Sequence, residues 1–305
     1  MLADSNPLLS TPCGVINVHK PQGLTSRDVV NRIQRLVWPA KVGHAGTLDP
    51  LATGVLLACV GKATRLIDYA QQMEKQYRGA FLLGRESNTE DVEGNVTLLA
   101  DPPIPSAAEV AAAAATFLGE TLQRPPAFSA LKIAGQRAYH LARSGRDVIL
   151  QPRKIIVHAM EVIAYEYPEL TLDIVCGGGT YVRSLGRDLA ERLGTGAVMS
   201  ALERTRIGSF SVADAWELTR MRPENRADWL LTARRLTPSL PSVELSAEQA
   251  IEIAAGRYIE LSAQHLRGAQ DIAALGPNGE LHSILQPRGA DQYGARVNLG
   301  DVPGS

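Results

Sequence analysis

A glycine-rich stretch with one acidic residue runs directly into an apolar segment. Residues 43–54 read Gly-His-Ala-Gly-Thr-Leu-Asp-Pro-Leu-Ala-Thr-Gly, and an apolar run follows at 55–60. Such a run predicts a buried strand, so Asp49 lies at the entrance to the core. Burial of a lone carboxylate is costly, and Asp49 is therefore expected either to meet a cation inside the fold or to stand in a cleft. A solvated carboxylate in a purely structural turn is the alternative.

The composition excludes several classes of protein. The chain has 305 residues, of which 45% are hydrophobic, and a formal net charge of -1. This length suits two domains, and the charge excludes a highly basic, tail-driven binder of polyanions but not a local basic face for nucleic acid. Cys13, Cys59 and Cys176 are scattered, so a zinc site is not expected. The absence of a signal-peptide pattern and of a membrane-spanning apolar run predicts a soluble, cytoplasmic protein.

Hydrophobic periodicity predicts an α+β (mixed α/β) fold. Helices are expected behind two capping pairs, Thr25 with Asp28 and Ser106 with Glu109, because apolar residues or alanines recur at helical spacing after each. The expected helices are 26–37, 63–72, an alanine-rich segment stopping at Gly119, and 180–193, and the expected strands are 54–60, 77–83, 154–165 and 170–176. Their irregular alternation argues against a doubly wound fold.

Pro238 and Pro241 mark a break, beyond which a small module is predicted. Ser246 and Gln249 form a capping pair for a short helix that ends before Gly256. Strand-like pieces follow at 272–275, 281–285 and 295–299. The expected organisation is a flexible N-terminus at 1–12, a main domain at 13–240 and a β-rich domain at 242–305.

Two tyrosines beside arginines add weight to a functional site. Tyr77 precedes Arg78, and Tyr181 lies close to Arg183. An aromatic face with a neighbouring cation suits a base that has left its stack, although two half-buried strand tyrosines are the plainer interpretation. Arg183 follows a run of glycines at a strand-to-helix corner, where a positive charge is unfavourable. It is a candidate partner that keeps Asp49 ionised, with a surface arginine as the alternative.

The remaining polar and charged motifs give weaker indications of function than Asp49, the tyrosines and Arg183. Residues 88–94 form an acidic turn with too few ligands for calcium, and no serine or cysteine nucleophile with a matching base is evident. His44 on its own is expected at the surface or in a hydrogen bond. The basic residues of the first half are candidates for a phosphate-binding face, with a solvated surface as the default: Lys20, Arg27, Lys41, Lys62, Arg65, Lys75, Arg78, Lys132 and Arg137.

Six segments together resemble the TruB family of tRNA pseudouridine synthases. They are His-Lys-Pro-Gln-Gly-Leu-Thr-Ser at 19–26, the stretch at 43–54, Lys-Gln-Tyr at 75–77, Asn-Thr-Glu-Asp-Val-Glu-Gly at 88–94, Pro-Pro-Ala-Phe-Ser-Ala-Leu-Lys at 125–132 and Gly-Thr-Tyr-Val-Arg at 179–183. Their order and spacing agree with the family over residues 14–210. His19 stands where an aspartate is common and Gly178 where a lysine is common, which is expected to weaken RNA contacts.

The resemblance implies a fold, a reaction and a substrate. The fold is a mixed, largely antiparallel sheet flanked by helices, followed by a module similar to the RNA-binding PUA domain. The reaction is the isomerisation of uridine to pseudouridine at position 55 in the T loop of tRNA, with the base flipped out of its stack. No atoms are gained or lost, so neither a cofactor nor a metal is implied. The T stem-loop of tRNA is the expected partner of a monomer that needs no obligate protein partner and no membrane.

The resemblance also implies roles for individual residues. Asp49 matches the essential aspartate, which attacks the sugar or the base, or else removes a ribose proton. Arg183 pairs with Asp49, and Tyr77 stacks on the flipped uracil and assists proton transfer. The implied substrate-binding residues are Tyr77 itself, His44 where the base leaves its stack, Tyr181 and Leu202 in the uracil pocket, and Lys20 as a support for the loop.

Three alternatives stay open at this stage. The same scaffold suits a non-catalytic RNA-binding or tRNA-folding protein, although intact Asp49, Tyr77 and Arg183 argue against lost catalysis. A hydrolase with Asp49 and Asp91 as acid and base would release free uracil. A related isomerase that depends on a guide RNA would be inactive on a T stem-loop by itself.

Overall fold

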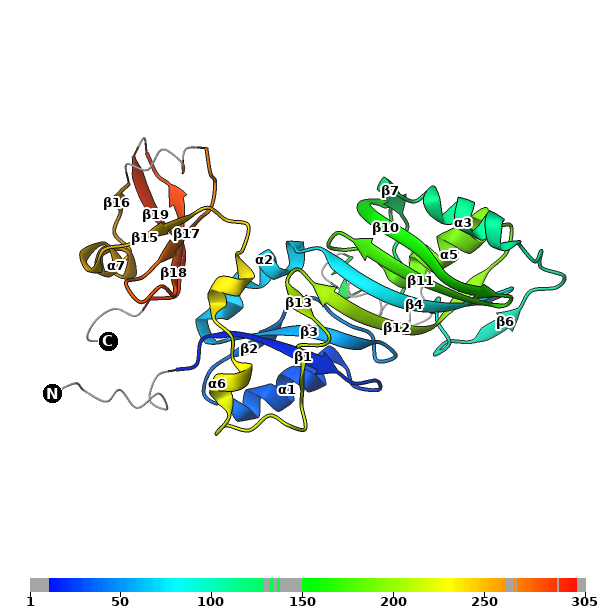
Figure 1. Ribbon diagram of the computed structural model, residues 1–305, viewed down its shortest axis with the longest axis horizontal. Coiled ribbons are helices and arrows are strands. Elements are labelled where there is room, and N and C mark those ends of the chain that lie inside the picture. The colour runs from blue at the N-terminus through cyan, green and yellow to red at the C-terminus, as the bar shows by residue number, and fades with distance from the viewer. Residues whose placement is uncertain are drawn as a thin grey trace.

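The structure is a computed structural model that describes residues 11–128, 132–133, 136–137, 150–261, 266, 268–289 and 291–300. Most of the N-terminus expected to be flexible, at 1–12, lies outside the described residues. The rest forms a main body with a ten-stranded sheet and a C-terminal module with a five-stranded sheet (Figure 1). Within these ranges no helix has the length and apolar character needed to cross a membrane.

The sheet of the main body is mixed and largely antiparallel, as expected. Its order is β14-β1-β3-β12-β4-β11-β10-β7, with β2 paired to β3 and β13 to β12. The pairs β1–β14 and β3–β12 are parallel. The strands are β1 (Gly14–Lys20), β2 (Val42–His44), β3 (Thr53–Val60), β4 (Lys75–Leu83), β7 (Gly119–Gln123), β10 (Arg153–Glu166), β11 (Glu169–Cys176), β12 (Ala197–Ile207), β13 (Phe210–Ser211) and β14 (Trp216–Glu217). Short hairpins lie outside this sheet: β5 (Arg85–Ser87) with β6 (Val96–Leu98), and β8 (Lys132–Ile133) with β9 (Gln136–Arg137).

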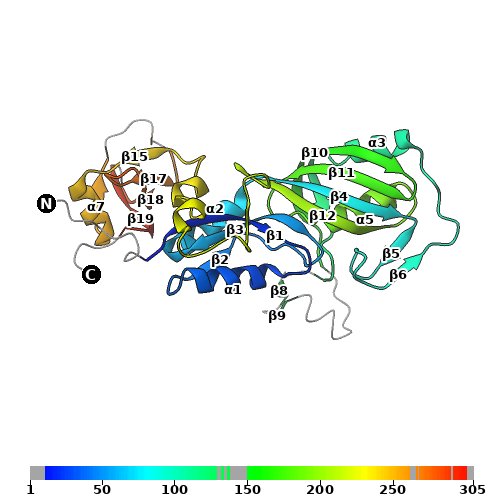
Figure 2. The same ribbon diagram turned by 60° about the horizontal axis from the view of Figure 1, so that its bottom comes forward.

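Helices pack on both halves of this sheet. Helix α1 (Ser26–Leu36) begins with the predicted capping box and lies beside β1–β3, whereas α3 (Ala107–Ala115) and α5 (Val182–Arg192) lie on the half that contains β4, β10 and β11 (Figures 1 and 2). Gly186 allows α5 to approach closely, because a Cβ at this position would lie 2.1 Å from the Phe81 ring. This close approach places α5 directly on β4.

The expected elements are largely confirmed, with three differences. Segment 63–72 is a 3-10 helix, η1 (Gly61–Leu66), followed by a short α2 (Ile67–Gln72). The alanine-rich helix ends at Ala115, and Gly119 opens the unpredicted strand β7. The sequence pattern also does not predict β12, because Glu203 and the buried Arg204 interrupt its apolar alternation.

The C-terminal module is β-rich, as expected. Helix α7 (Ala247–Ala254) begins with the predicted capping box of Ser246 and Gln249. The strand expected at 295–299 instead begins at Gln292. The sheet has the order β15 (Ser242–Glu244), β17 (Ile272–Leu275), β18 (Leu281–Pro287), β19 (Gln292–Asn298) and β16 (Ile259–Glu260).

The module shares a hydrophobic cluster with the main body. Residues of η1 and α2 pack in one cluster with residues of β17, β18 and β19, including Ala63, Leu66, Ala70, Leu275, Ile284 and Val297. At the border, Lys62 Nζ donates to the carbonyl of Gly300 at 2.6 Å and Arg65 Nη1 to that of Asn298 at 2.8 Å. These two cations of the predicted phosphate-binding face therefore join the two parts of the molecule.

Beside this cluster, Asp271 of the module forms hydrogen bonds both to the main body and within the module. Its carboxylate accepts from the Tyr69 hydroxyl of α2 at 2.8 Å, from Gln286 Nε2 at 2.9 Å and from Arg296 Nη1 at 2.7 Å. Burial and the neighbouring Asp271 raise the pKa of Tyr69 to about 12, so its hydroxyl is a donor at all ordinary pH values.

Replacing Asp271 by alanine is expected to lower the free energy of unfolding by roughly 1–3 kcal/mol, because several donors lose a charged acceptor. Urea denaturation followed by circular dichroism measures the change. Asp228→Ala, in the exposed first turn of α6 (Arg226–Trp229), is the control. Equal stabilities of the two variants would contradict the role of Asp271.

Candidate active site

The loop that carries Asp49 connects β2 to β3 and is fixed through its main chain. Ser26 Oγ accepts from the Leu48 amide at 2.8 Å and donates to the Leu48 carbonyl at 3.1 Å. The Ala52 amide donates to the Asp49 carbonyl at 3.1 Å, which closes a turn. The Asp49 side chain stays 36% exposed. A rigid main chain thus presents a carboxylate that a ligand can reach.

Lys20 supports the aspartate loop from inside the protein. Its side chain is fully buried, and Nζ donates to the carbonyls of Pro21 at 2.9 Å, Leu24 at 2.7 Å and Pro50 at 3.4 Å. Burial lowers the pKa of Lys20 to about 8, although the nearby Asp49 charge opposes this shift. Lys20 is therefore placed to support the loop, as expected, and its burial removes it from the set that contacts a substrate directly.

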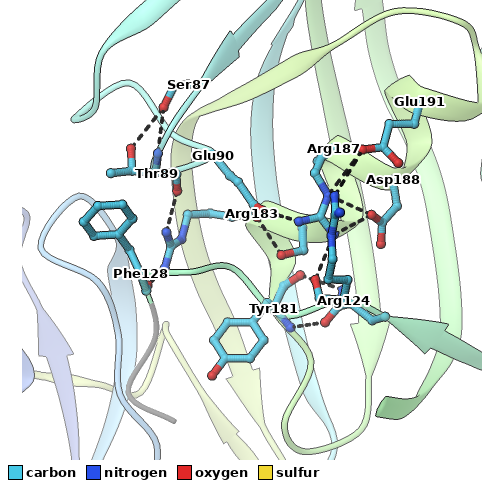
Figure 3. Close-up of polar contacts among 12 residues, drawn as sticks. Ser87, Thr89, Glu90, Arg124, Phe128, Tyr181, Arg183, Arg187, Asp188 and Glu191 are labelled. Carbon is cyan, nitrogen blue, oxygen red and sulfur yellow. Dashed lines mark hydrogen bonds and ion pairs between the residues drawn. The ribbon is translucent and has the colours of Figure 1, made fainter. Parts of the chain in front are cut away.

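Arg183 forms the predicted ion pair with Asp49. Its Nε lies 2.9 Å from Asp49 Oδ2, and its side chain is only 6% exposed. Nη1 donates to the Thr89 carbonyl at 2.6 Å, and Nη2 to the Phe128 carbonyl at 3.2 Å (Figure 3). Asp91 Oδ2 lies 3.6 Å from Nη1. The guanidinium of Arg183, in the first turn of α5, thus forms ion pairs with two carboxylates and donates hydrogen bonds to two carbonyls.

The acidic turn at 88–94 has a structural role that the sequence does not reveal. Glu90 accepts from Ser184 Oγ at 2.6 Å and pairs with Arg187, both on α5 (Figure 3). Its carbonyl accepts from the Met199 amide of β12 at 3.0 Å. Burial raises the pKa of Glu90, and the charge of Arg187 opposes that rise. The turn is thereby fixed to α5 and β12, which places Thr89 and Asp91 beside Arg183.

Asp91 is nearly buried, and this bears on the hydrolase alternative. Its Oδ1 accepts from Thr89 Oγ1 at 2.5 Å and from the Glu93 amide at 3.1 Å, while Oδ2 faces Arg183. Its side chain is 5% exposed, against 36% for Asp49. An acid and base pair would need both carboxylates to face one substrate, so this arrangement disfavours the hydrolase.

Tyr77 and Leu202 lie together next to the aspartate loop. Tyr77 is on β4 opposite Arg204 of β12, and Leu202 is opposite Gly79 on the same face. Both belong to the hydrophobic cluster that includes Leu48 of the loop. Tyr77 is 7% exposed, and burial raises its pKa. The structure therefore places an aromatic ring and an apolar side chain in the same cluster as Leu48, the residue before Asp49.

Tyr181 and His44, the two remaining predicted site residues, are each anchored through the main chain. The main chain of Tyr181 is held by the buried Gln123, which accepts from its amide at 2.9 Å and donates to its carbonyl at 3.0 Å. Arg153 Cζ lies 4.9 Å from the Tyr181 ring centre. His44 is the last residue of β2, where it pairs with Ala58, and its side chain is half-buried.

The predicted phosphate-binding face does not form one surface. Lys20 and Lys75 are buried, Lys62 and Arg65 contact the C-terminal module, and Arg78 pairs with Asp173 at 3.2 Å. Exposed members include Arg27 and Lys41, and the side chains of Lys132 and Arg137 lie outside the described residues. The expectation was wrong for the buried lysines because sequence position does not reveal which face of a strand a side chain occupies.

Gly178, where the resemblance implies a lysine, is packed closely against the end of α2. A Cβ at this position would lie 2.5 Å from the Gln71 carbonyl oxygen. The loop and the end of α2 would have to separate to admit a lysine. Within the described residues, no three His, Cys, Asp or Glu side chains gather in a way that suits a metal ion.

Lys20 gives the protein a pH-dependent stability. Its folded pKa of about 8 lies below the ordinary 10.5, so the unfolded chain binds more protons between these values and unfolding becomes less favourable as pH rises through this window. Wild type is therefore expected to gain stability relative to Lys20→Met between pH 8 and 10.5. Urea midpoints of both proteins at several pH values test this, and a constant difference across the window would contradict it.

Comparisons with known proteins agree with the sequence motifs and the fold. Residues 34–182 match the family described as TruB family pseudouridylate synthase, N-terminal domain. The chain is 38% identical to tRNA pseudouridine synthase B of Leifsonia xyli subsp. xyli, over 91% of this chain and 94% of the relative. It is 40% identical to the protein of that name from an Arthrobacter species, over 90% and 93% of the two chains.

Solved structures show the same fold. A structure described as an H/ACA RNP bound to a substrate RNA containing 2'-deoxyuridine has a TM-score of 0.71 at 22% identity, covering 95% of this chain and 86% of that chain. A Cbf5-Nop10-Gar1 complex has a TM-score of 0.70 at 25% identity, covering 93% and 84%. With close relatives matched along nearly their whole length, the chain belongs to the TruB family of pseudouridine synthases.

Proposed function

We propose that this protein isomerises uridine to pseudouridine in tRNA, and that its target is the uridine at position 55 in the T loop. The partly exposed Asp49 carboxylate, 2.9 Å from the buried Arg183 and near enough to Tyr77 for its charge to act on that hydroxyl, is the observation that carries the proposal. Membership of the family and relatives named tRNA pseudouridine synthase B support the reaction and the class of substrate.

The reaction needs no added atoms. The bond between C1' of the ribose and N1 of uracil breaks, the uracil rotates, and a bond from C1' to C5 forms. The C5 proton leaves, and N1 gains a proton. Asp49 acts either as a nucleophile or as a base for a ribose proton. In both cases the contact with Arg183 holds the carboxylate aimed at the sugar.

The uridine has to leave its stack to reach Asp49. Extrusion of a nucleotide costs free energy, and stacking on an aromatic ring returns roughly 1–3 kcal/mol per base. Tyr77 is the stacking residue in this proposal, with Leu202 and Tyr181 lining the uracil pocket and His44 contacting the RNA at the loop. The remaining affinity comes from phosphate contacts, which makes binding weaker at higher salt.

We further propose that the protein acts in the cytoplasm as a monomer, without a guide RNA or a protein partner. The similar solved structures named above are complexes with other proteins or with RNA. Activity of the isolated chain on a T stem-loop separates this proposal from guide dependence. Pseudouridine formed only in the presence of an added RNA would contradict it.

Asp49→Ala is expected to lose all measurable pseudouridine formation on unmodified tRNA, because the reacting carboxylate is gone. Tritium release from C5-labelled tRNA measures the rate, and mapping of the modified nucleotide tests the position. Asp214→Ala, an exposed aspartate that contacts Ser211, is the control. Wild type without activity would overturn the function, and an active Asp49→Ala would overturn the site.

Asp91→Asn is expected to slow the reaction by about 10-fold or more, which corresponds to roughly 1.4 kcal/mol, because the guanidinium of Arg183 loses the negative charge that lies 3.6 Å from its Nη1. The affinity for tRNA should stay close to wild type because Asp91 is buried. Single-turnover rates and filter binding separate the two effects. A variant with an unchanged rate would show that Arg183 is held sufficiently by its other partners.

A further inference from the structure

The two halves of the main sheet meet at a short joint between β3 and β12. These strands pair in parallel through Glu203 with Thr53 and Arg204 with Gly54. The aspartate loop leads into β3, whereas Tyr77 lies on β4, on the other side of β12. The separation of Asp49 and Tyr77 therefore depends on how firmly this joint is held.

The main chains approach very closely at the joint. Gly54 has a φ of +97°, and a Cβ there would lie 2.3 Å from the carbonyl oxygen of Arg204. Only glycine accepts both the conformation and the contact. The aspartate loop therefore rejoins the sheet directly against the backbone of Arg204.

The side chain of Arg204 connects the loop to the tyrosine. It is 2% exposed, and Nε donates to the Val55 carbonyl at 2.7 Å. Nη2 lies 3.3 Å from the carbonyl of Gly46, within the aspartate loop. Cζ lies 6.0 Å from the centre of the Tyr77 ring, and the Arg204 charge opposes the rise that burial causes in the Tyr77 pKa.

The partners of this guanidinium make its burial costly. In the part of the chain that the structure describes, its hydrogen bonds go to main-chain carbonyls and not to a carboxylate. A buried cation without a counter-charge is expensive, and an apolar side chain would fill the same space at lower cost. The planar guanidinium of Arg204 uses two separate nitrogens, Nε and Nη2, for the two carbonyls, whereas a lysine has all its donors on one nitrogen.

We infer that Arg204 is a positioning residue that keeps the aspartate loop and Tyr77 at a fixed separation across the β3–β12 joint. Its effect on the loop follows from the geometry alone. Its effect on the reaction rests on the proposed function. These two consequences are tested separately.

Hydrogen exchange tests the loop without reference to activity. In Arg204→Met, amides of the peptide spanning 43–54 are expected to exchange about 10-fold faster or more, because local opening becomes easier. Arg204→Lys should be intermediate. Arg206→Met is the matched control, since Arg206 is on the same strand but contacts Gln76, Glu74 and Gly208. It should leave this peptide at the wild-type rate.

Single-turnover kinetics test the consequence for the reaction. A displacement of the loop by a fraction of an ångström to one ångström is expected to lower the rate of pseudouridine formation by about 100-fold in Arg204→Met. The affinity for tRNA should stay within about 3-fold of wild type, because the buried side chain acts on an intramolecular separation. Arg204→Lys should recover part of the rate.

The outcomes separate this inference from the proposed function. Exchange at 43–54 that matches the Arg206→Met control in both Arg204 variants overturns the inference. A rate loss that is matched by the loss of tRNA affinity also overturns it. If Arg204→Met does not fold, Arg204→Lys decides the question, and wild-type exchange and rate in that variant are the overturning result. Wild type that forms no pseudouridine defeats the proposed function, and the exchange experiment still decides the role of Arg204.

Discussion

The buried guanidinium of Arg183 is the interaction on which the candidate site depends. It joins the loop that carries Asp49 to the acidic turn at 88–94 and to the carbonyl of Phe128. These segments are far apart in the sequence, and among the described residues no strand pairing joins them to one another. A planar group with donors on several sides is able to connect them. Any ligand at Asp49 therefore meets a carboxylate whose orientation is already determined.

Buried cations recur around this site, with main-chain carbonyls as partners. Lys20 contacts carbonyls of the aspartate loop and the turn before it, Lys75 donates to Met73 at 2.5 Å, and Arg204 contacts Val55 and Gly46. In irregular segments, some main-chain carbonyls receive no hydrogen bond from a helix or a sheet and need another donor. A cation supplies several donors at one point, so it orders such a segment without secondary structure. The desolvation that this requires is visible in the pKa of Lys75, which burial lowers to about 8.

Local signals in the sequence predict local structure well. The capping boxes of α1, α3 and α7 are all present, and the glycine corner before Arg183 does direct its side chain to Asp49. Contacts between distant segments are harder to foresee. The sequence places Asp91 in an acidic turn and offers it as a second carboxylate for a hydrolase, but it does not predict the approach of Asp91 to Arg183, which depends on Glu90 pairing with α5. Arg204 carries no sequence signal of burial, because its partners are backbone atoms that every residue possesses.

The hydrophobic cluster that η1 and α2 share with β17, β18 and β19 has a thermodynamic consequence. Moving the C-terminal module away from the main body would expose apolar faces on both, at a free-energy cost that grows with the exposed area. Opening at this border is therefore coupled to the loss of native packing within each part. The shared cluster therefore favours one arrangement of the two sheets, in contrast to domains joined only by a flexible linker.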